Sequence, residues 1–137
     1  MMIWIIKIEV MYFEEPWSVT IELDSETVLD DLHRMIQAAV GFDNDHMYEF
    51  YISRNERSER RTVFDDNNGL LYTTRLKSIY PLGIGNKFYY LFDYGDDWLF
   101  KISKSRKKEQ PAKEGITYPR IMSEVGSKPE QYPNWDE

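Results

Sequence analysis

Hydrophobic and polar residues alternate in five segments of the chain, as expected for half-buried β-strands. The segments cover residues 2–10, 17–23, 47–52, 87–94 and 98–102. The alternation is clearest in 17–23, where apolar side chains are separated by Ser18, Thr20 and Glu22. The pair Gly95-Asp96 is favourable for a tight turn, so the last two segments are predicted to form an antiparallel hairpin.

A different spacing, with apolar residues three and four positions apart, predicts a helix over residues 28–40. Thr27 is placed to cap this helix and Asp30 to complete a capping box. Gly41 is expected to end it in a left-handed conformation. Residues 74–80 are compatible with one further helical turn, which Pro81 would end.

This order of elements predicts an α+β fold. We expect a β-grasp-like (ubiquitin-like) arrangement, in which one main helix packs across a mostly antiparallel or mixed sheet. The whole chain, residues 1–137, is predicted to be a single domain. Periodicity is lost after Ser103, and prolines follow at 119, 129 and 133. Residues 105–137 are therefore expected to form an irregular C-terminal tail that packs on the domain or trails from it.

The chain is acidic and contains no cysteine, with a net charge of −7. Without cysteine there are no disulfides, thiolate nucleophiles or cysteine-ligated metal sites, and a cytoplasmic location is favoured. The apolar N-terminus is interrupted by Lys7 and Glu9 and is too short to span a bilayer, so no membrane association is expected.

The charge is unevenly distributed, with −9 over residues 1–53, +5 over 54–108 and −3 over 109–137. Two basic runs follow predicted strands. They are Arg54, Arg57, Arg60 and Arg61, and then Lys101, Lys104, Arg106, Lys107 and Lys108. If the runs converge, Arg54, Arg57, Arg61, Lys104 and Arg106 could contact an anion such as phosphate, and Tyr89 and Trp98 could stack on bases. The alternative, favoured by the nearby Glu56 and Glu59, is a solvated loop and a charged sheet edge.

His33 and His46 are the only two histidines. With a carboxylate from Asp93, Asp96 or Asp97 they could form a metal or acid–base site. Their spacing matches no metal-ligand motif, which favours two structural histidines: a helix histidine hydrogen-bonded to the loop, and a turn histidine that holds Asp43 or Asp45.

The segment Asp93-Tyr94-Gly95-Asp96-Asp97-Trp98 concentrates three carboxylates. It could bind a cation or supply a paired acid and base, but turn chemistry is favoured because Asp and Gly tolerate turn geometry. Asp93 lies beside aromatic residues and should need a partner, either Arg75 or a histidine. The sequence contains no catalytic motif, so we assign no catalytic residue and expect no cofactor.

Three segments carry a family resemblance: LDDLHRMIQAAVGFDNDHMYEF at 29–50, FYYLFDYGDDWLFKI at 88–102, and the tail from Tyr118-Pro119 to Pro129-Glu130. In these segments the chain resembles the plasmid pRiA4b Orf-3-like family. It departs from the family pattern after Trp17, where arginines are usual, and in a tail without a Cys or a Gly-Gly pair. The resemblance implies a compact α+β domain found on plasmids, insertion elements and chromosomes, without an assigned activity.

These observations favour a non-catalytic binding or interaction module, with an unknown protein as the expected partner. Two alternatives stay open. One is a small metal-dependent enzyme that uses His33, His46 and Asp93. The other, which follows only from the family resemblance, is a nucleic-acid-binding protein of a mobile element.

Overall fold

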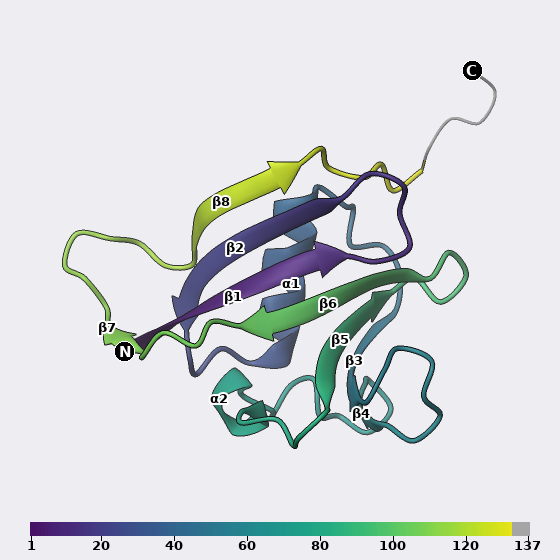
Figure 1. Cartoon of the computed structure of the whole chain (residues 1–137), viewed down its shortest axis with the longest axis horizontal. Helices are drawn as coiled ribbons and strands as arrows, with labels where there is room; N and C mark the ends of the chain where they lie inside the picture. Colours follow the sequence, from purple (N-terminus) through teal and green to yellow (C-terminus); the bar gives the residue numbers. More distant parts are fainter. Residues whose placement is uncertain (133–137) are drawn as a thin grey trace.

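The protein folds around one large antiparallel sheet, accompanied by two short helices (Figure 1). The computed structural model describes residues 1–132. The elements in chain order are β1 (Met2–Val10), β2 (Trp17–Asp24), α1 (Leu29–Val40), β3 (Tyr48–Ser53), β4 (Thr62–Phe64), α2 (Leu76–Ile79), β5 (Lys87–Phe92), β6 (Trp98–Lys104), β7 (Gln110–Pro111) and β8 (Arg120–Gly126).

The strands lie in the order β4-β3-β5-β6-β1-β2-β8, and β7 pairs with the start of β1. All of these pairs are antiparallel, including the predicted hairpin of β5 and β6. The predicted β-grasp-like fold with one main helix across the sheet is therefore wrong. Alternation located five strands, but it does not specify which strands are neighbours, and it missed the three strands β4, β7 and β8.

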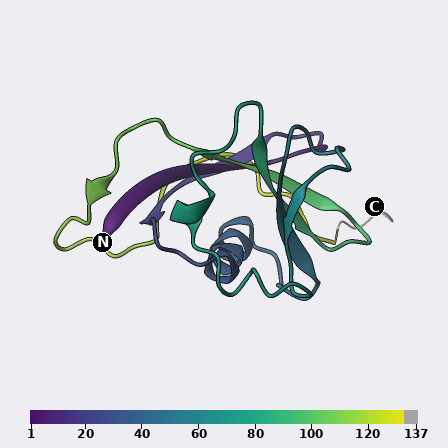
Figure 2. The ribbon, with the colours of Figure 1, turned by 90° about the horizontal axis from the view of Figure 1, so that it is seen from below.

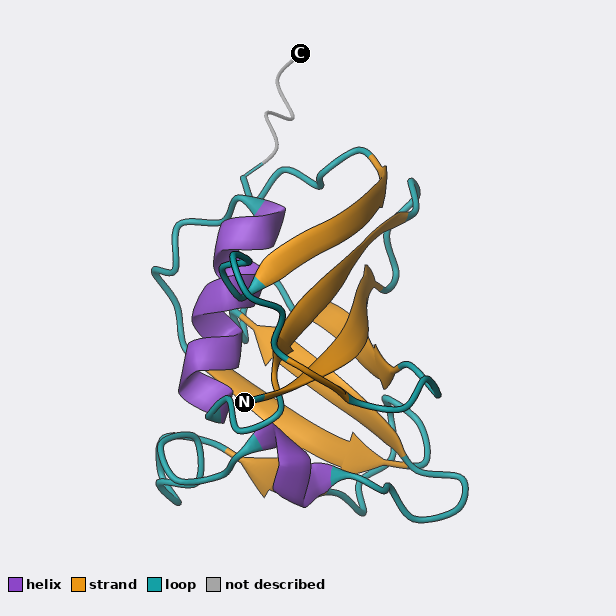
Figure 3. Ribbon diagram, turned by 90° about the vertical axis from the view of Figure 1, so that its left-hand side faces the viewer, coloured by secondary structure: helices purple, strands orange, loops and turns teal. Residues whose placement is uncertain are grey.

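The sheet curves around α1, which lies on its concave side (Figures 2 and 3). Leu29, Leu32 and Ile36 of α1 belong to the same buried cluster as Ile8 and Phe100 of the facing strands. The burial of these apolar side chains is the main stabilising contribution in a domain of this size. The opposite face of the sheet carries a smaller cluster of Tyr51, Tyr89 and Leu99.

The two ends of α1 differ in how well they were predicted. The capping box at Thr27 and Asp30 is wrong, because Val28 is the N-cap and no side chain caps the helix. The Thr27 hydroxyl instead donates to the carbonyl oxygen of Asp24, at 2.6 Å. The predicted C-terminal residue is confirmed: Gly41 has a φ of +79°, and its N–H donates to the carbonyl of Gln37.

The C-terminal segment is more regular than predicted. Within the expected irregular tail of 105–137, β8 pairs along β2 at the edge of the sheet. All seven residues of β8 are exposed, so no alternation marks them as a strand. That the chain forms one domain over 1–137 stays a prediction. Within residues 1–132, no helix is long and apolar enough to cross a membrane.

Candidate functional site

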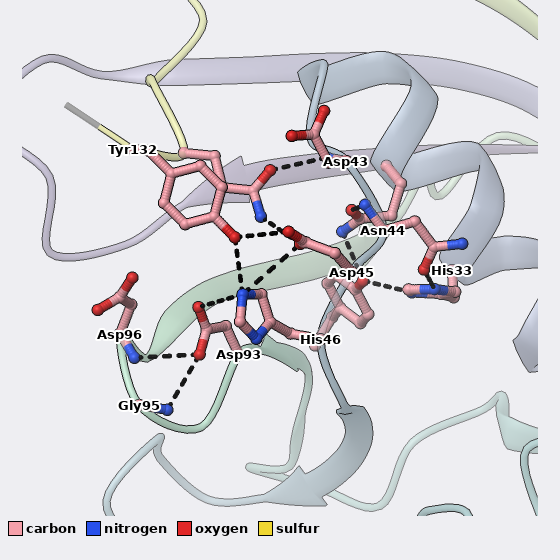
Figure 4. Close-up of polar contacts among 12 residues, drawn as sticks. His33, Asp43, Asn44, Asp45, His46, Asp93, Gly95, Asp96 and Tyr132 are labelled. Carbon is pink, nitrogen blue, oxygen red and sulfur yellow. Dashed lines mark hydrogen bonds and ion pairs between the residues drawn. The ribbon is translucent and has the colours of Figure 1, made fainter.

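His46 lies just before β3, at the centre of a polar cluster that we call the His46 cluster (Figure 4). Its Nε2 atom is 2.7 Å from the hydroxyl of Tyr132, 3.4 Å from Oδ2 of Asp93 and 3.6 Å from Oδ1 of Asp45. The structure therefore brings together His46 and Asp93, as the sequence suggested. It also includes Asp45, one of the two partners expected for a structural His46, and adds Tyr132, which the sequence gave no reason to select.

The single hydroxyl proton of Tyr132 decides how this cluster is bonded. Tyr132 donates to Oδ2 of Asp45 at 2.6 Å, so its oxygen accepts from the Nε2–H of His46. The hydrogen bond to the Asp45 carboxylate raises the pKa of Tyr132 to about 12 and lowers the pKa of Asp45. Gln131 also bonds Asp45, at 2.8 Å. The cluster thus fastens the C-terminal segment to the loop before β3.

Asp93 is buried and serves the turn between β5 and β6. It has a φ of +63°, and its Oδ1 accepts hydrogen bonds from the N–H groups of Gly95, at 3.1 Å, and Asp96, at 3.3 Å. Its partner is His46. The alternative partner considered from the sequence, Arg75, instead lies 3.7 Å from Glu26.

The other candidate residues of the segment 93–98 do not point to one common site. Asp96 and Asp97 are exposed, and Asp97 has a φ of +53°. The ring of Trp98 packs against Phe13 and Phe42, at centroid distances of 5.7 and 4.9 Å. Trp98 thus belongs to the packing between loops rather than to a free stacking surface. Tyr89, the other expected stacking residue, is 1% exposed.

His33 is buried in α1 and belongs to a different network from His46. Its two ring nitrogens bond the hydroxyl of Tyr90 and Oδ1 of Asn44, and its ring stacks on Tyr48 at 3.5 Å. Gln37 closes the ring of hydrogen bonds: its Nε2 donates to the Tyr90 hydroxyl, and its Oε1 accepts from the Asn44 N–H, both at 3.0 Å. Burial lowers the pKa of His33.

The set His33, His46 and Asp93 is therefore not assembled as one site, because only His46 and Asp93 are neighbours. Over residues 1–132, no group of three or more His, Asp and Glu side chains is arranged to hold a metal ion.

The two basic runs also lie apart. Arg57 and Arg61 of the first run are placed over aromatic rings, Arg57 over Tyr12 at 5.7 Å and Arg61 over Tyr51 at 4.1 Å. These residues line a hollow of about 270 Å³ together with Glu56 and Asp97. Arg54 and Arg60 are exposed and do not line it.

The second basic run surrounds a groove of about 810 Å³, which we call the basic groove. Its basic lining consists of Lys87, Lys101, Lys104, Arg106, Lys107 and Lys108, and its aromatic lining of Trp4 and Tyr80. Within residues 1–132, none of the six basic side chains forms an ion pair. The one acidic residue of the lining, Glu109, accepts a hydrogen bond from Nε1 of Trp4 at 2.8 Å.

At the groove, β6 extends beyond its neighbour β5. The last β5 pair is Phe88 with Ile102, so Ser103 and Lys104 extend beyond the paired part of β5. The ring of Tyr80 meets the edge of Trp4 there, at 5.7 Å and 84°. The Tyr80 hydroxyl is buried and has no hydrogen-bond partner among residues 1–132, and burial raises its pKa.

Sequence reasoning identified Lys104 and Arg106 but missed Trp4, Tyr80 and Lys87. These three come from separate segments, and only the tertiary structure places them beside the second basic run. No local signal in the sequence could have found them.

The end of β6 that lines the basic groove and the turn that carries Asp96 and Asp97 lie at opposite ends of this strand. Lys104 ends this strand and Trp98 begins it, next to Asp96 and Asp97. A strand of seven residues spans about 20 Å. The basic run that ends at Lys108 and the carboxylates of Asp96 and Asp97 are therefore separated along the strand.

The chain is similar to proteins of unknown function. The family model described as "Plasmid pRiA4b ORF-3-like protein" matches residues 2–131. No curated protein matches. A crystal structure of a protein of unknown function from Methanosarcina mazei Go1 is similar with a TM-score of 0.73 and 22% sequence identity, covering 90% of this chain and 69% of that one. At this identity, the likeness concerns the fold alone.

Proposed function

The chain belongs to the plasmid pRiA4b ORF-3-like family, and from this premise we propose that it is a non-catalytic binding module for a phosphate-bearing ligand. The ligand would lie in the basic groove. The observation that carries the proposal is the gathering of six basic side chains, none of them ion-paired within residues 1–132, around one groove of a chain with a net charge of −7.

Electrostatics supports an anion as the ligand. Basic side chains gathered around one hollow repel each other, and a concave surface strengthens their common field. A bound anion relieves this repulsion and accepts charge-assisted hydrogen bonds, which are about twice as strong as neutral ones. Phosphate fits this lining because several lysine and arginine side chains can share its oxygens.

The side chains in the groove support binding rather than chemistry. Besides the six cations, the two aromatic rings and two serines, the lining consists of Asn86 and the aliphatic Pro81, Leu82 and Ile102, and its one carboxylate, Glu109, is engaged by Trp4. The two histidines do not line the groove. His46 instead holds the C-terminal segment to the loop before β3.

A cytoplasmic location is part of the proposal, because a chain without cysteine needs no oxidising compartment to fold. The protein partner expected from the sequence stays a prediction.

Titration calorimetry with inorganic tripolyphosphate tests the proposal. The double variant Lys104→Gln/Arg106→Gln should bind at least about tenfold more weakly than the unchanged chain, since a hydrogen bond to a charged group contributes about 1.5 kcal/mol or more. Arg54→Gln/Arg60→Gln removes the same charge from exposed residues outside the groove and should change affinity less than about twofold. Equal losses in both variants, or no binding to the unchanged chain, would overturn the proposal.

A further inference from the structure

We infer that the ligand of the basic groove is a single-stranded nucleic acid, an inference that rests on the proposed function. It follows from three features: a second basic hollow beside the groove, aromatic rings in the lining of both, and the acidic remainder of the molecule.

The basic lining continues beyond the groove. A neighbouring hollow of about 460 Å³ shares Lys107 and Lys108 with it and adds Lys113 and Tyr118; its one carboxylate, Glu22, is paired with Arg120. The same two lysines therefore stand between two hollows. An isolated phosphate would occupy one of the hollows, whereas an extended chain with repeated phosphates can contact both.

Aromatic rings lie among the cations. Trp4 and Tyr80 line the groove, and Tyr118 lines the second hollow. The ammonium group of Lys104 lies over the Trp4 ring, 4.7 Å from its centre. A base could take this place while the flexible lysine turns towards a phosphate. Stacking of a base on an aromatic side chain contributes about 1–3 kcal/mol.

An unpaired strand fits this surface better than a duplex does. Bases in a duplex are stacked on each other and cannot reach a ring in a groove wall, whereas single strands can turn their bases outward. The net charge of −7 also opposes the binding of a long duplex, since phosphate attraction dominates such binding.

An acidic peptide is the other polyanion to consider. Its carboxylates could meet the lysines, but its polar backbone would lie against Trp4 and Tyr80 without flat apolar groups to stack on them. The alternation of cations and rings therefore favours a ligand in which charged groups alternate with flat rings.

Fluorescence anisotropy with four labelled probes separates these ligands: a 12-residue oligothymidylate, an abasic strand with the same number of phosphates, a 12-base-pair duplex and oligoglutamate. We expect the oligothymidylate to bind at least about fivefold more tightly than the abasic strand, because stacking on one ring contributes about 1–3 kcal/mol. The duplex and oligoglutamate should bind more weakly than the oligothymidylate.

Trp4→Leu should remove most of the preference for the oligothymidylate over the abasic strand, and any effect of releasing Glu109 should weaken the binding of both strands alike. Trp98→Leu is the matched control, because Trp98 lies at the far end of β6 and should not affect the preference. If Trp4→Leu does not fold, Lys107→Gln/Lys108→Gln decides instead. It should lower the salt-dependence slope for the oligothymidylate by about one per lysine removed.

Equal affinity for the oligothymidylate and the abasic strand would overturn this inference, as would tighter binding of oligoglutamate or of the duplex. In these cases tripolyphosphate would still bind, and the proposed function would stand. If tripolyphosphate and all four probes fail to bind, both the inference and the proposed function fail.

Discussion

At the scale of single residues, His33 shows how burial fixes a protonation state. The closed ring of hydrogen bonds suits the neutral imidazole: Nε2–H donates to Asn44, and Nδ1 accepts from Tyr90, whose oxygen accepts from Gln37. A second ring proton would compete with the Tyr90 hydroxyl proton. Burial is the largest effect on the pKa of His33 and lowers it, whereas the hydrogen bond to Asn44 and the charge of Asp30 raise it and Arg34 lowers it.

This network predicts a pH dependence of stability. Because the pKa of His33 is lowered in the folded chain, only the unfolded chain gains a proton as the pH falls below the ordinary value of 6.5. The His33 contribution is fully present above that pH and is lost as the pH falls towards the folded pKa. Urea unfolding from pH 7.5 to pH 5 should show this loss.

His33→Phe should remove the His33 contribution to the pH dependence of the unfolding free energy. It should also lower the unfolding free energy at pH 7.5 by roughly 1–3 kcal/mol, because the partners of the imidazole lose a hydrogen bond. His46→Gln is the control, since the other histidine is more exposed and should leave the His33 slope in place. A slope unchanged by His33→Phe would contradict the assignment.

Two substitutions of Asp93 distinguish whether this residue stabilises the fold by accepting hydrogen bonds in the turn or by its charge. Asp93→Ala removes the acceptor for two N–H groups at a residue with a φ of +63° and should cost about 1–2 kcal/mol. Asp93→Asn keeps an acceptor oxygen and tolerates this φ, so it should cost less than about 1 kcal/mol. Equal losses in thermal unfolding would assign the importance of Asp93 to its charge beside His46.

At the scale of elements, side-chain contacts with β2 help to hold the last strand, β8, at the edge of the sheet. Nε1 of Trp17 in β2 donates to Glu124 of β8 at 2.6 Å, and Arg120 of β8 pairs with Glu22 of β2 at 2.9 Å. At the end of β8, Gly126 has a φ of +83°, and a Cβ atom there would lie 2.0 Å from the carbonyl oxygen of Pro16. Only glycine fits this close approach.

Gly126→Ala should therefore loosen β8 from β2. We expect a loss of more than about 2 kcal/mol, since a strained backbone conformation alone costs roughly 1–3 kcal/mol and the contact with Pro16 adds to it. Hydrogen exchange of the β2 amides that face β8 should become faster.

Gly115→Ala is the matched control. Gly115 has a nearly equal φ of +81°, but a Cβ atom there would meet no atom within 4 Å. It should cost about 1–2 kcal/mol, the price of a left-handed conformation for a residue with a side chain. Equal effects of the two variants would show that the contact with Pro16 is unimportant.

At the scale of the whole molecule, the separation of charge along β6 predicts how distant aspartates affect ligand affinity in the basic groove. Along the strand, Asp97 lies about 13 Å from Lys101, the first residue of β6 that lines the basic groove, and about 20 Å from Lys104 at its end. Charges at these distances are screened at 0.15 M salt, where the Debye length is about 8 Å, but not at 0.01 M, where it is about 30 Å.

Asp96→Asn/Asp97→Asn should thus change the affinity for tripolyphosphate less than about twofold at 0.15 M salt and raise it clearly at 0.01 M. Calorimetric titrations at both salt concentrations measure this. A large change at 0.15 M would mean that the loop of residues 93–97 contacts the ligand directly.

The sequence by itself determined the local elements wherever one side of them is buried. Five strands, the main helix and the position of Gly41 follow from side-chain spacing, because spacing reflects which face of an element meets the core. It also indicated that Asp93 needs a partner, either Arg75 or a histidine, and the structure supplies His46.

The tertiary structure alone decided how the strands are ordered and which distant residues share a surface. Strand β8 is exposed along its whole length, so no periodicity marks it, and only its pairing with β2 makes it a strand. The groove needs Trp4, Tyr80 and the end of β6 side by side, and His33 is separated from His46 by the hydrogen-bond partners that each acquires on folding. Spacing along the chain records the faces of an element, whereas contacts between elements depend on packing that no single segment contains.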